Sequence, residues 1–201
     1  MRNALPTIAG AFVLSATLAA NPLVQAGQTP YPGGTKGQQA RPPVGQGDGE
    51  HASTGSTDAD FMKKAANAGQ AEMELADVAN QQSPSASVKA LASKIKSDHT
   101  EAASELKRLA ETKHVVLPSS LMADQQAMRD RIRKLSGAAF DRTYVDQMVA
   151  DHREAVDLFT KASHSGDTEV AAFASKTLPA LKDHLQRSEA LQKSMGGGDR
   201  P

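Results

Sequence analysis

The sequence contains no cysteine and no tryptophan, and aromatic residues make up only 3% of its 201 positions. The absence of cysteine excludes disulfide bonds, thiolate metal sites and a cysteine nucleophile. A sheet-based core normally relies on β-branched and aromatic side chains, so this composition disfavours one. An excess of charge is also missing, with 23 basic against 23 acidic residues. Because no basic stripe is available to neutralise a phosphate backbone, nucleic acid is not expected as a partner.

The first 26 residues have the pattern of a signal peptide for export. Arg2 supplies a positive N-terminal region, an apolar run follows over residues 8–20, and Val24-Gln25-Ala26 fits a cleavage site with small residues at its first and third positions. The apolar run is shorter than the ~20 residues that a membrane-spanning helix needs. We therefore expect cleavage after Ala26, no transmembrane anchor afterwards, and a periplasmic or secreted protein.

Residues 27–57 form a stretch rich in glycine and proline that contains almost no large apolar side chains. Such a segment cannot bury enough apolar surface to offset the entropy lost on ordering, so we predict a disordered linker. Two interpretations are open for it: a tether to a protein partner in the cell envelope, or an inert spacer. A second disordered segment is predicted for the tail, residues 194–201.

Residues 58–193 are dominated by strong helix formers, and their apolar residues recur at steps of three and four, as in amphipathic helices. Ser83 and Pro84 are predicted to be the N-cap and the first residue of one helix, and Asp167 is predicted to cap another. Pro179 should bend the last helix, because it removes one backbone hydrogen bond. The predicted helices span about 58–81, 84–113, 121–135, 138–164 and 168–193.

Short connections after the first and fourth of these helices predict two antiparallel hairpins, which the third and shortest helix would link. The expected fold is therefore all-α: an antiparallel four-helix bundle of the ferritin-like type, with a short extra helix in the crossover.

One ionisable residue occupies the apolar stripe of each long helix: Glu72, His99, His152 and His184. At 1.5 Å of rise per residue, and with side chains tilted toward each helix's own N-terminus, all four residues could reach one layer in mid-bundle. Three imidazoles and a carboxylate would suit one transition metal ion: Zn²⁺, Fe²⁺, Cu²⁺ or Mn²⁺. The adjacent Asp98, Asp151 and Asp183 are less suited to bind the metal directly but could accept hydrogen bonds from imidazole N–H groups.

A competing interpretation needs no metal. The histidines could hydrogen-bond Glu72, Thr177 or Ser188 and so fix the register of the bundle. The protein would then be a structural, stress-protection or protein-interaction module of the cell envelope. Neither a nucleophile elbow nor a glycine-rich phosphate loop is present, so an enzyme is not the favoured expectation.

Several segments together resemble the exported bacterial family called domain of unknown function 4142. They are Ala71-Glu72, Asp98-His99, the Phe-Asp-x-x-Tyr segment 140–144, Asp151-His152 and the Leu-Pro-x-Leu-x-x-His segment 178–184. The resemblance implies a ferritin-like bundle in the bacterial envelope but no particular activity.

Di-iron ferritin-like proteins carry a Glu-x-x-His pair on each of two helices. Here the residues three positions before the stripe histidines are Lys96, Val149 and Leu181. The di-iron motif is therefore absent, and ferroxidase or oxygenase chemistry is not expected.

Overall fold

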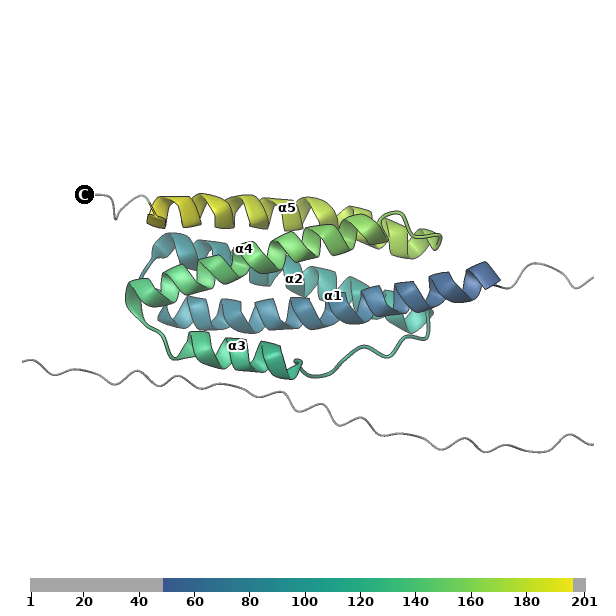
Figure 1. Cartoon of the computed structure of the whole chain (residues 1–201), viewed down its shortest axis with the longest axis horizontal. Helices are drawn as coiled ribbons and strands as arrows, with labels where there is room; N and C mark the ends of the chain where they lie inside the picture. The colour runs from purple at the N-terminus through teal and green to yellow at the C-terminus, as the bar shows by residue number, and fades with distance from the viewer. Residues whose placement is uncertain (1–48, 197–201) are drawn as a thin grey trace, which may run out of the picture. The chain divides into compact units, whose positions relative to one another are not determined.

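The computed structural model describes residues 49–196, in which all regular secondary structure is helical (Figure 1). The predicted signal peptide, the first part of the predicted linker and the residues after 196 lie outside the described residues. The helices are α1 (Gly49–Gln82), α2 (Ala86–Thr112), α3 (Ala123–Arg133), α4 (Gly137–Ala162) and α5 (Thr168–Gly196).

Two helix boundaries differ clearly from the prediction. Helix α1 begins at Gly49, nine residues before the predicted start at 58. The predicted disordered linker therefore overlaps the helix over residues 49–57, a stretch without a proline that would interrupt helical hydrogen bonding. Helix α5 continues to Gly196 and passes through Pro179 without a break in helical structure.

The start of α2 also needs a correction, because Ser85 and not Ser83 is its N-cap. The Ser85 hydroxyl accepts a hydrogen bond from the Val88 N–H at 3.3 Å. Ser83 instead donates to the buried carboxylate of Asp141 on α4, at 2.5 Å, and so ties the α1–α2 connection to that helix. The predicted capping of α5 by Asp167 is confirmed, since its carboxylate accepts from the N–H groups of residues 169 and 170.

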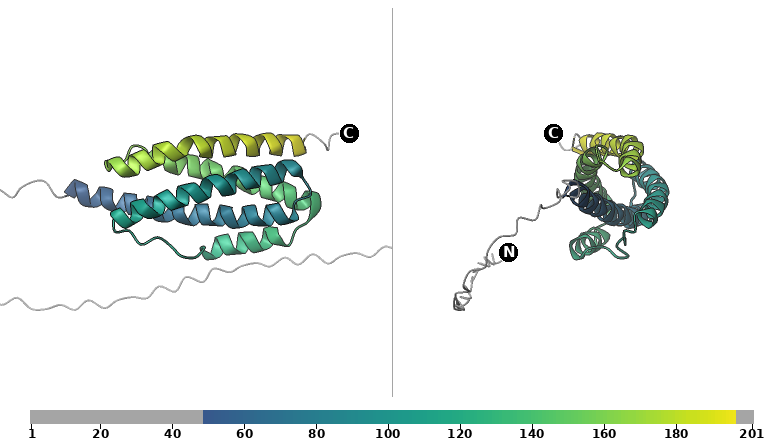
Figure 2. Two further views of the ribbon diagram at one scale, coloured as in Figure 1. Left: turned by 180° about the vertical axis from the view of Figure 1, so that it is seen from behind. Right: turned by 90° about the vertical axis from the view of Figure 1, so that its right-hand side faces the viewer.

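The four long helices surround a common axis, and α3 lies outside them (Figure 2). Helix α1 packs on α2 and α4, and α5 packs on the same two helices. The α2–α3 connection is held to α1 by a hydrogen bond from the Asn67 amide to the Ser120 carbonyl oxygen, at 3.0 Å. The prediction of a helical bundle is confirmed. None of the helices within residues 49–196 combines the length and the apolar character of a membrane span.

The core consists of two apolar clusters at opposite ends of the bundle. Along each long helix, the residue of the predicted polar layer lies between the residues of one cluster and those of the other. The first cluster contains a group of three aromatic rings, in which the centroids of Phe61 and Phe159 lie 5.0 Å apart and those of Phe159 and Phe173 5.9 Å apart. The second cluster is built from aliphatic side chains around Phe140 and Tyr144. On α1, for example, Ala65 belongs to the first cluster and Leu75 to the second, with Glu72 between them.

Candidate metal centre

The four polar stripe residues converge in the interior of the bundle, each from a different helix. Glu72 Oε2 lies 3.0 Å from His99 Nε2 and 3.3 Å from His152 Nε2. His152 Nε2 in turn lies 3.1 Å from His184 Nδ1. The three imidazoles offer nitrogens that all lie within 4.8 Å of one another. The side chains of His152, His184 and Glu72 are at most 2% exposed.

The hydrogen bonds at the far sides of two rings determine where their protons are. His152 Nδ1 lies 2.9 Å from the Met148 carbonyl oxygen, and His184 Nε2 lies 2.8 Å from the Asp98 carboxylate. Both partners are acceptors, so each of these ring nitrogens carries the proton. In the neutral rings, His152 Nε2 and His184 Nδ1 therefore present lone pairs to each other. That contact is repulsive unless a proton or a cation lies between the two nitrogens.

The Glu72 carboxylate is a third hydrogen-bond acceptor beside the ring nitrogens of His152 and His184. Burial alone would raise the pKa of Glu72, but His99 and His152 outweigh it and lower the pKa to about 2. The group is therefore a carboxylate at neutral pH. Among the described residues, neither Glu72 Oε2 nor His99 Nε2 has a hydrogen-bond partner of adequate geometry, although the two atoms are within ion-pair distance. The two atoms nevertheless lie 3.0 Å apart, and they form an ion pair when His99 is protonated.

The two halves of the cluster differ in their affinity for protons. Burial lowers the pKa of His184 to about 4, and the charges of the other two histidines act in the same direction. For His99 burial also acts to lower the pKa, but the Glu72 carboxylate prevails and raises it. His184 is thus neutral at pH 7, as a metal ligand must be.

Only one of the three neighbouring aspartates accepts a bond from an imidazole, and it does so across helices. Asp98 on α2 binds His184 on α5 and is itself bound by Lys94 at 2.9 Å. Partial burial would raise the pKa of Asp98, but the hydrogen bonds from Lys94 and His184 lower it. Asp151 accepts from Gln147 and Asp183 from Arg187, so the prediction for these two residues was wrong.

The charge of the layer also shifts the pKa of a buried tyrosine and of a partly buried aspartate. The hydroxyl of Tyr144 has no hydrogen-bond partner among the described residues. Burial, with the charges of Glu72 and Asp151, raises its pKa. Burial and the Glu72 charge also raise the pKa of Asp151 to about 7.

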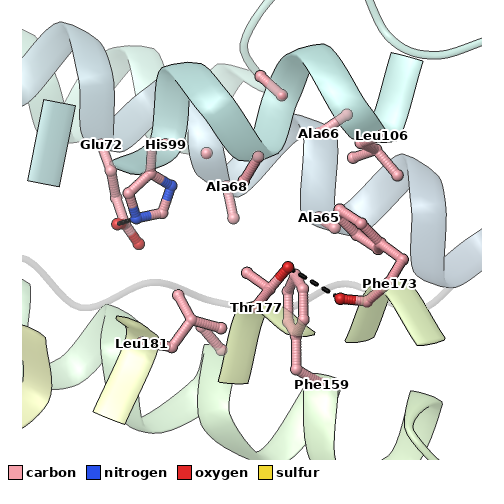
Figure 3. A pocket seen from close by; sticks show the side chains of 14 residues that line it. Ala65, Ala66, Ala68, Glu72, His99, Leu106, Phe159, Phe173, Thr177 and Leu181 are labelled. Atoms are coloured by element: carbon pink, nitrogen blue, oxygen red, sulfur yellow. Dashed lines mark hydrogen bonds and ion pairs between the residues drawn. The ribbon is translucent and has the colours of Figure 1, made fainter. Parts of the chain in front are cut away.

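A small cavity of about 40 Å³ adjoins the cluster on the side of Glu72 and His99 (Figure 3). Its other lining residues are alanines, Gly69, leucines and phenylalanines, with Thr177 as the one further polar side chain in the lining. The Thr177 hydroxyl donates to the Phe173 carbonyl oxygen of its own helix, at 2.9 Å. Ser188 likewise donates to the His184 carbonyl oxygen. Neither hydroxyl serves as a partner for an imidazole ring. Of the three partners that the metal-free interpretation named, only Glu72 lies within ion-pair distance of histidines, namely His99 and His152.

The fold and the site together define a class: a helical-bundle protein whose apolar core is interrupted by a buried layer of imidazoles and a carboxylate. The family described as "Domain of unknown function (DUF4142)" matches residues 45–191. The chain belongs to this family, which confirms the resemblance found in the sequence motifs.

Two solved structures of another helical family share the fold. One is a DUF305 fragment from Deinococcus radiodurans, with 14% identity and a TM-score of 0.62, which covers 69% of this chain and 96% of that one. The other is a DUF305 protein from Streptomyces coelicolor, described as a candidate secreted protein, with 14% identity, a TM-score of 0.62 and coverage of 71% and 94%. No match was found among curated proteins.

Proposed function

We propose that this protein is an exported helical-bundle protein that binds one transition metal ion through Glu72, His99, His152 and His184. The observation that carries the proposal is the 3.1 Å contact between His152 Nε2 and His184 Nδ1, which brings two lone pairs together when both rings are neutral. A cation between them, shared with the Glu72 carboxylate, would turn this repulsion into attraction. A ligating histidine typically donates its other N–H to a carboxylate or carbonyl, as both of these rings do.

The donor set narrows the choice of metal. Three imidazole nitrogens and one carboxylate oxygen are borderline ligands, which suit Zn²⁺, Fe²⁺, Cu²⁺ and Mn²⁺. Met148, one turn before His152, could suggest a softer metal. Its side chain, however, belongs to the second apolar cluster, while its carbonyl oxygen is what fixes the ring of His152. A soft ion such as Cu⁺ is therefore not favoured.

Two further features belong to the proposal. We infer an antiparallel, ferritin-like arrangement of the four long helices from the short connections between α1 and α2 and between α4 and α5. We infer export from the sequence of residues 1–26, which has the features of a cleaved signal peptide. The mature protein would then meet its metal in the periplasm or outside the cell.

Metal analysis of the protein purified from its native compartment tests the proposal. We expect close to one metal ion per chain in the wild type and loss of that ion in the double variant His99→Leu/His152→Leu. Thermal unfolding with and without added Zn²⁺ supplies an independent measurement, because a ligand that binds only the folded state raises Tm. If the metal content were far below one ion per chain and unchanged in the double variant, the layer would be a metal-free polar network that fixes helix register.

A further inference from the structure

The cavity beside Glu72 and His99 bears on whether a bound metal would be accessible to another molecule. The cavity touches the α1–α2 half of the cluster, but neither His152 nor His184 contributes to its lining. Any additional ligand would therefore approach the metal from the side of Glu72 and His99. Because Glu72 and the three histidines already supply four ligands, that molecule would be a fifth ligand, and catalytic zinc sites are known to expand to five-coordination.

The size of the cavity limits what could occupy it. One water molecule needs at least about 10–15 Å³ of cavity volume, so a cavity of about 40 Å³ has room for only a few non-hydrogen atoms. Its walls carry no lysine or arginine, and Thr177 already donates its proton to a backbone carbonyl. A phosphate, a carboxylic acid of ordinary size or a sugar would find neither the room nor the hydrogen-bond partners.

Small residues line this space, and one of them, Gly69, carries a cost in helix stability. Gly69 lies in the interior of α1, where glycine is less favourable than alanine. A Cβ atom at Gly69 would meet His99 Nδ1 at 3.4 Å, an ordinary van der Waals contact, so steric exclusion does not explain the glycine. On the facing helix α2, Ala102 and Ala103 line the same cavity.

We propose that the metal held by Glu72 and the three histidines binds an exogenous ligand of two or three non-hydrogen atoms, such as a small linear monoanion, in the cavity beside Gly69 and Ala102. This inference rests on the proposed function, because it requires the metal. The inference adds a class of ligand to the proposed function. These are molecules that are small enough for an apolar cavity of this volume and that owe their affinity to coordination of the metal.

Azide and imidazole binding to the Co²⁺-loaded protein tests the proposal, since the visible spectrum of Co²⁺ reports changes in its coordination. The variants are Ala102→Val, which adds two methyl groups to the cavity wall, and Ala90→Val, the same change at an exposed position of α2. We expect azide, with three atoms in a line, to bind the wild type saturably and one to one, and the larger imidazole not to bind. Azide affinity should fall by about tenfold or more in Ala102→Val, because added atoms in a filled space are strongly unfavourable.

The control Ala90→Val should bind azide within about twofold of the wild type, and Co²⁺ affinity should be the same in all three proteins. Gly69→Ala provides a milder filling variant if Ala102→Val folds poorly. Bound Co²⁺ with no response to azide, equally tight binding of imidazole, or equal azide affinity in the filled and control variants would overturn the inference and leave the proposed function standing. Failure of the wild type to bind Co²⁺, Zn²⁺ or Fe²⁺ would overturn both.

Discussion

The two helix pairs contribute unequal halves to the polar layer. The α4–α5 half supplies His152 and His184, whose rings are buried and oriented by hydrogen bonds to Met148 and Asp98. The α1–α2 half supplies Glu72 and His99; the His99 side chain is 11% exposed, and both residues face the cavity. One half is thus rigid and preorganised, and the other adjoins free space.

This difference shows how a near-repeat in sequence can acquire two roles. Asp98-His99 and Asp151-His152 begin the same five-residue pattern, Asp-His-x-Glu-Ala, on α2 and α4. Asp98 nevertheless supports the ring of His184, whereas Asp151 is bound by Gln147 on its own helix. The roles of the two motifs depend on which helices surround them.

The largest expected effect is a loss of metal affinity, and it should differ between variants of the two halves of the polar layer. His152→Leu removes a ligand that is fixed and fully buried, and we expect Zn²⁺ affinity to fall by more than about a hundredfold, beyond the range usual for supporting residues. His99→Leu should cost less, since the raised pKa of His99 means that a proton competes more strongly with the metal for this ring. Competition titrations with a chelator of known affinity measure both losses. A greater loss in His99→Leu would reverse the ranking of the two halves.

The carboxylate that supports the rigid half provides the second prediction. Asp98→Asn keeps the shape of the side chain but weakens the acceptor for the His184 N–H, so metal affinity should fall by about 10–100-fold. The matched control is Asp183→Asn, in which the changed carboxylate is bound by Arg187 on the surface. Calorimetric titration with Zn²⁺ should show the control within about twofold of the wild type. Equal losses in both variants would mean that general electrostatics, and not the His184 contact, determines affinity.

The third prediction concerns the protonation of His99 and His184 in the metal-free protein. The NMR signals of the two imidazole rings report it as the pH is varied. His184 should stay neutral until the pH approaches its pKa of about 4, whereas His99 should remain protonated above pH 6.5. Since the folded-state pKa of His184 is lowered, its contribution to stability is complete above pH 6.5 and is lost as the pH falls toward 4. The contribution of His99 has the opposite sign: it is present below pH 6.5 and is lost as the pH rises through its raised pKa. Two superimposable titration curves would abolish the distinction between the halves.

The smallest expected effect is a change in stability when the cavity beside Glu72 and His99 is partly filled. Gly69→Ala should stabilise the protein by about 0.5–1 kcal/mol through the higher helix propensity of alanine, provided that His99 does not move. Gly55→Ala is the control, because a Cβ at that position of α1 meets nothing within 4 Å. Chemical denaturation of both variants gives the comparison. Destabilisation in Gly69→Ala alone would show that His99 needs the space for itself.

Much of the bundle and the identity of the four clustered residues could be predicted from the sequence. Helical periodicity is a local property, so the stripes that carry Glu72, His99, His152 and His184 can be read along each helix separately. The requirement that a buried stripe be apolar made these four residues conspicuous. The start of α2 was misplaced by the choice between two serines two residues apart, because Ser83 was needed for a contact with Asp141 that local patterns cannot reveal.

The sequence by itself determined the helical class, the interior position of the four polar residues and the absence of thiolate chemistry, because composition and period are local quantities. Only the tertiary structure decided that Asp98 orients His184, that His152 Nε2 faces His184 Nδ1, and that a cavity adjoins Glu72 and His99. Those features depend on the rotation and axial offset of neighbouring helices. Because a shift of a single residue along a helix rotates a side chain by about 100°, periodicity alone cannot specify them.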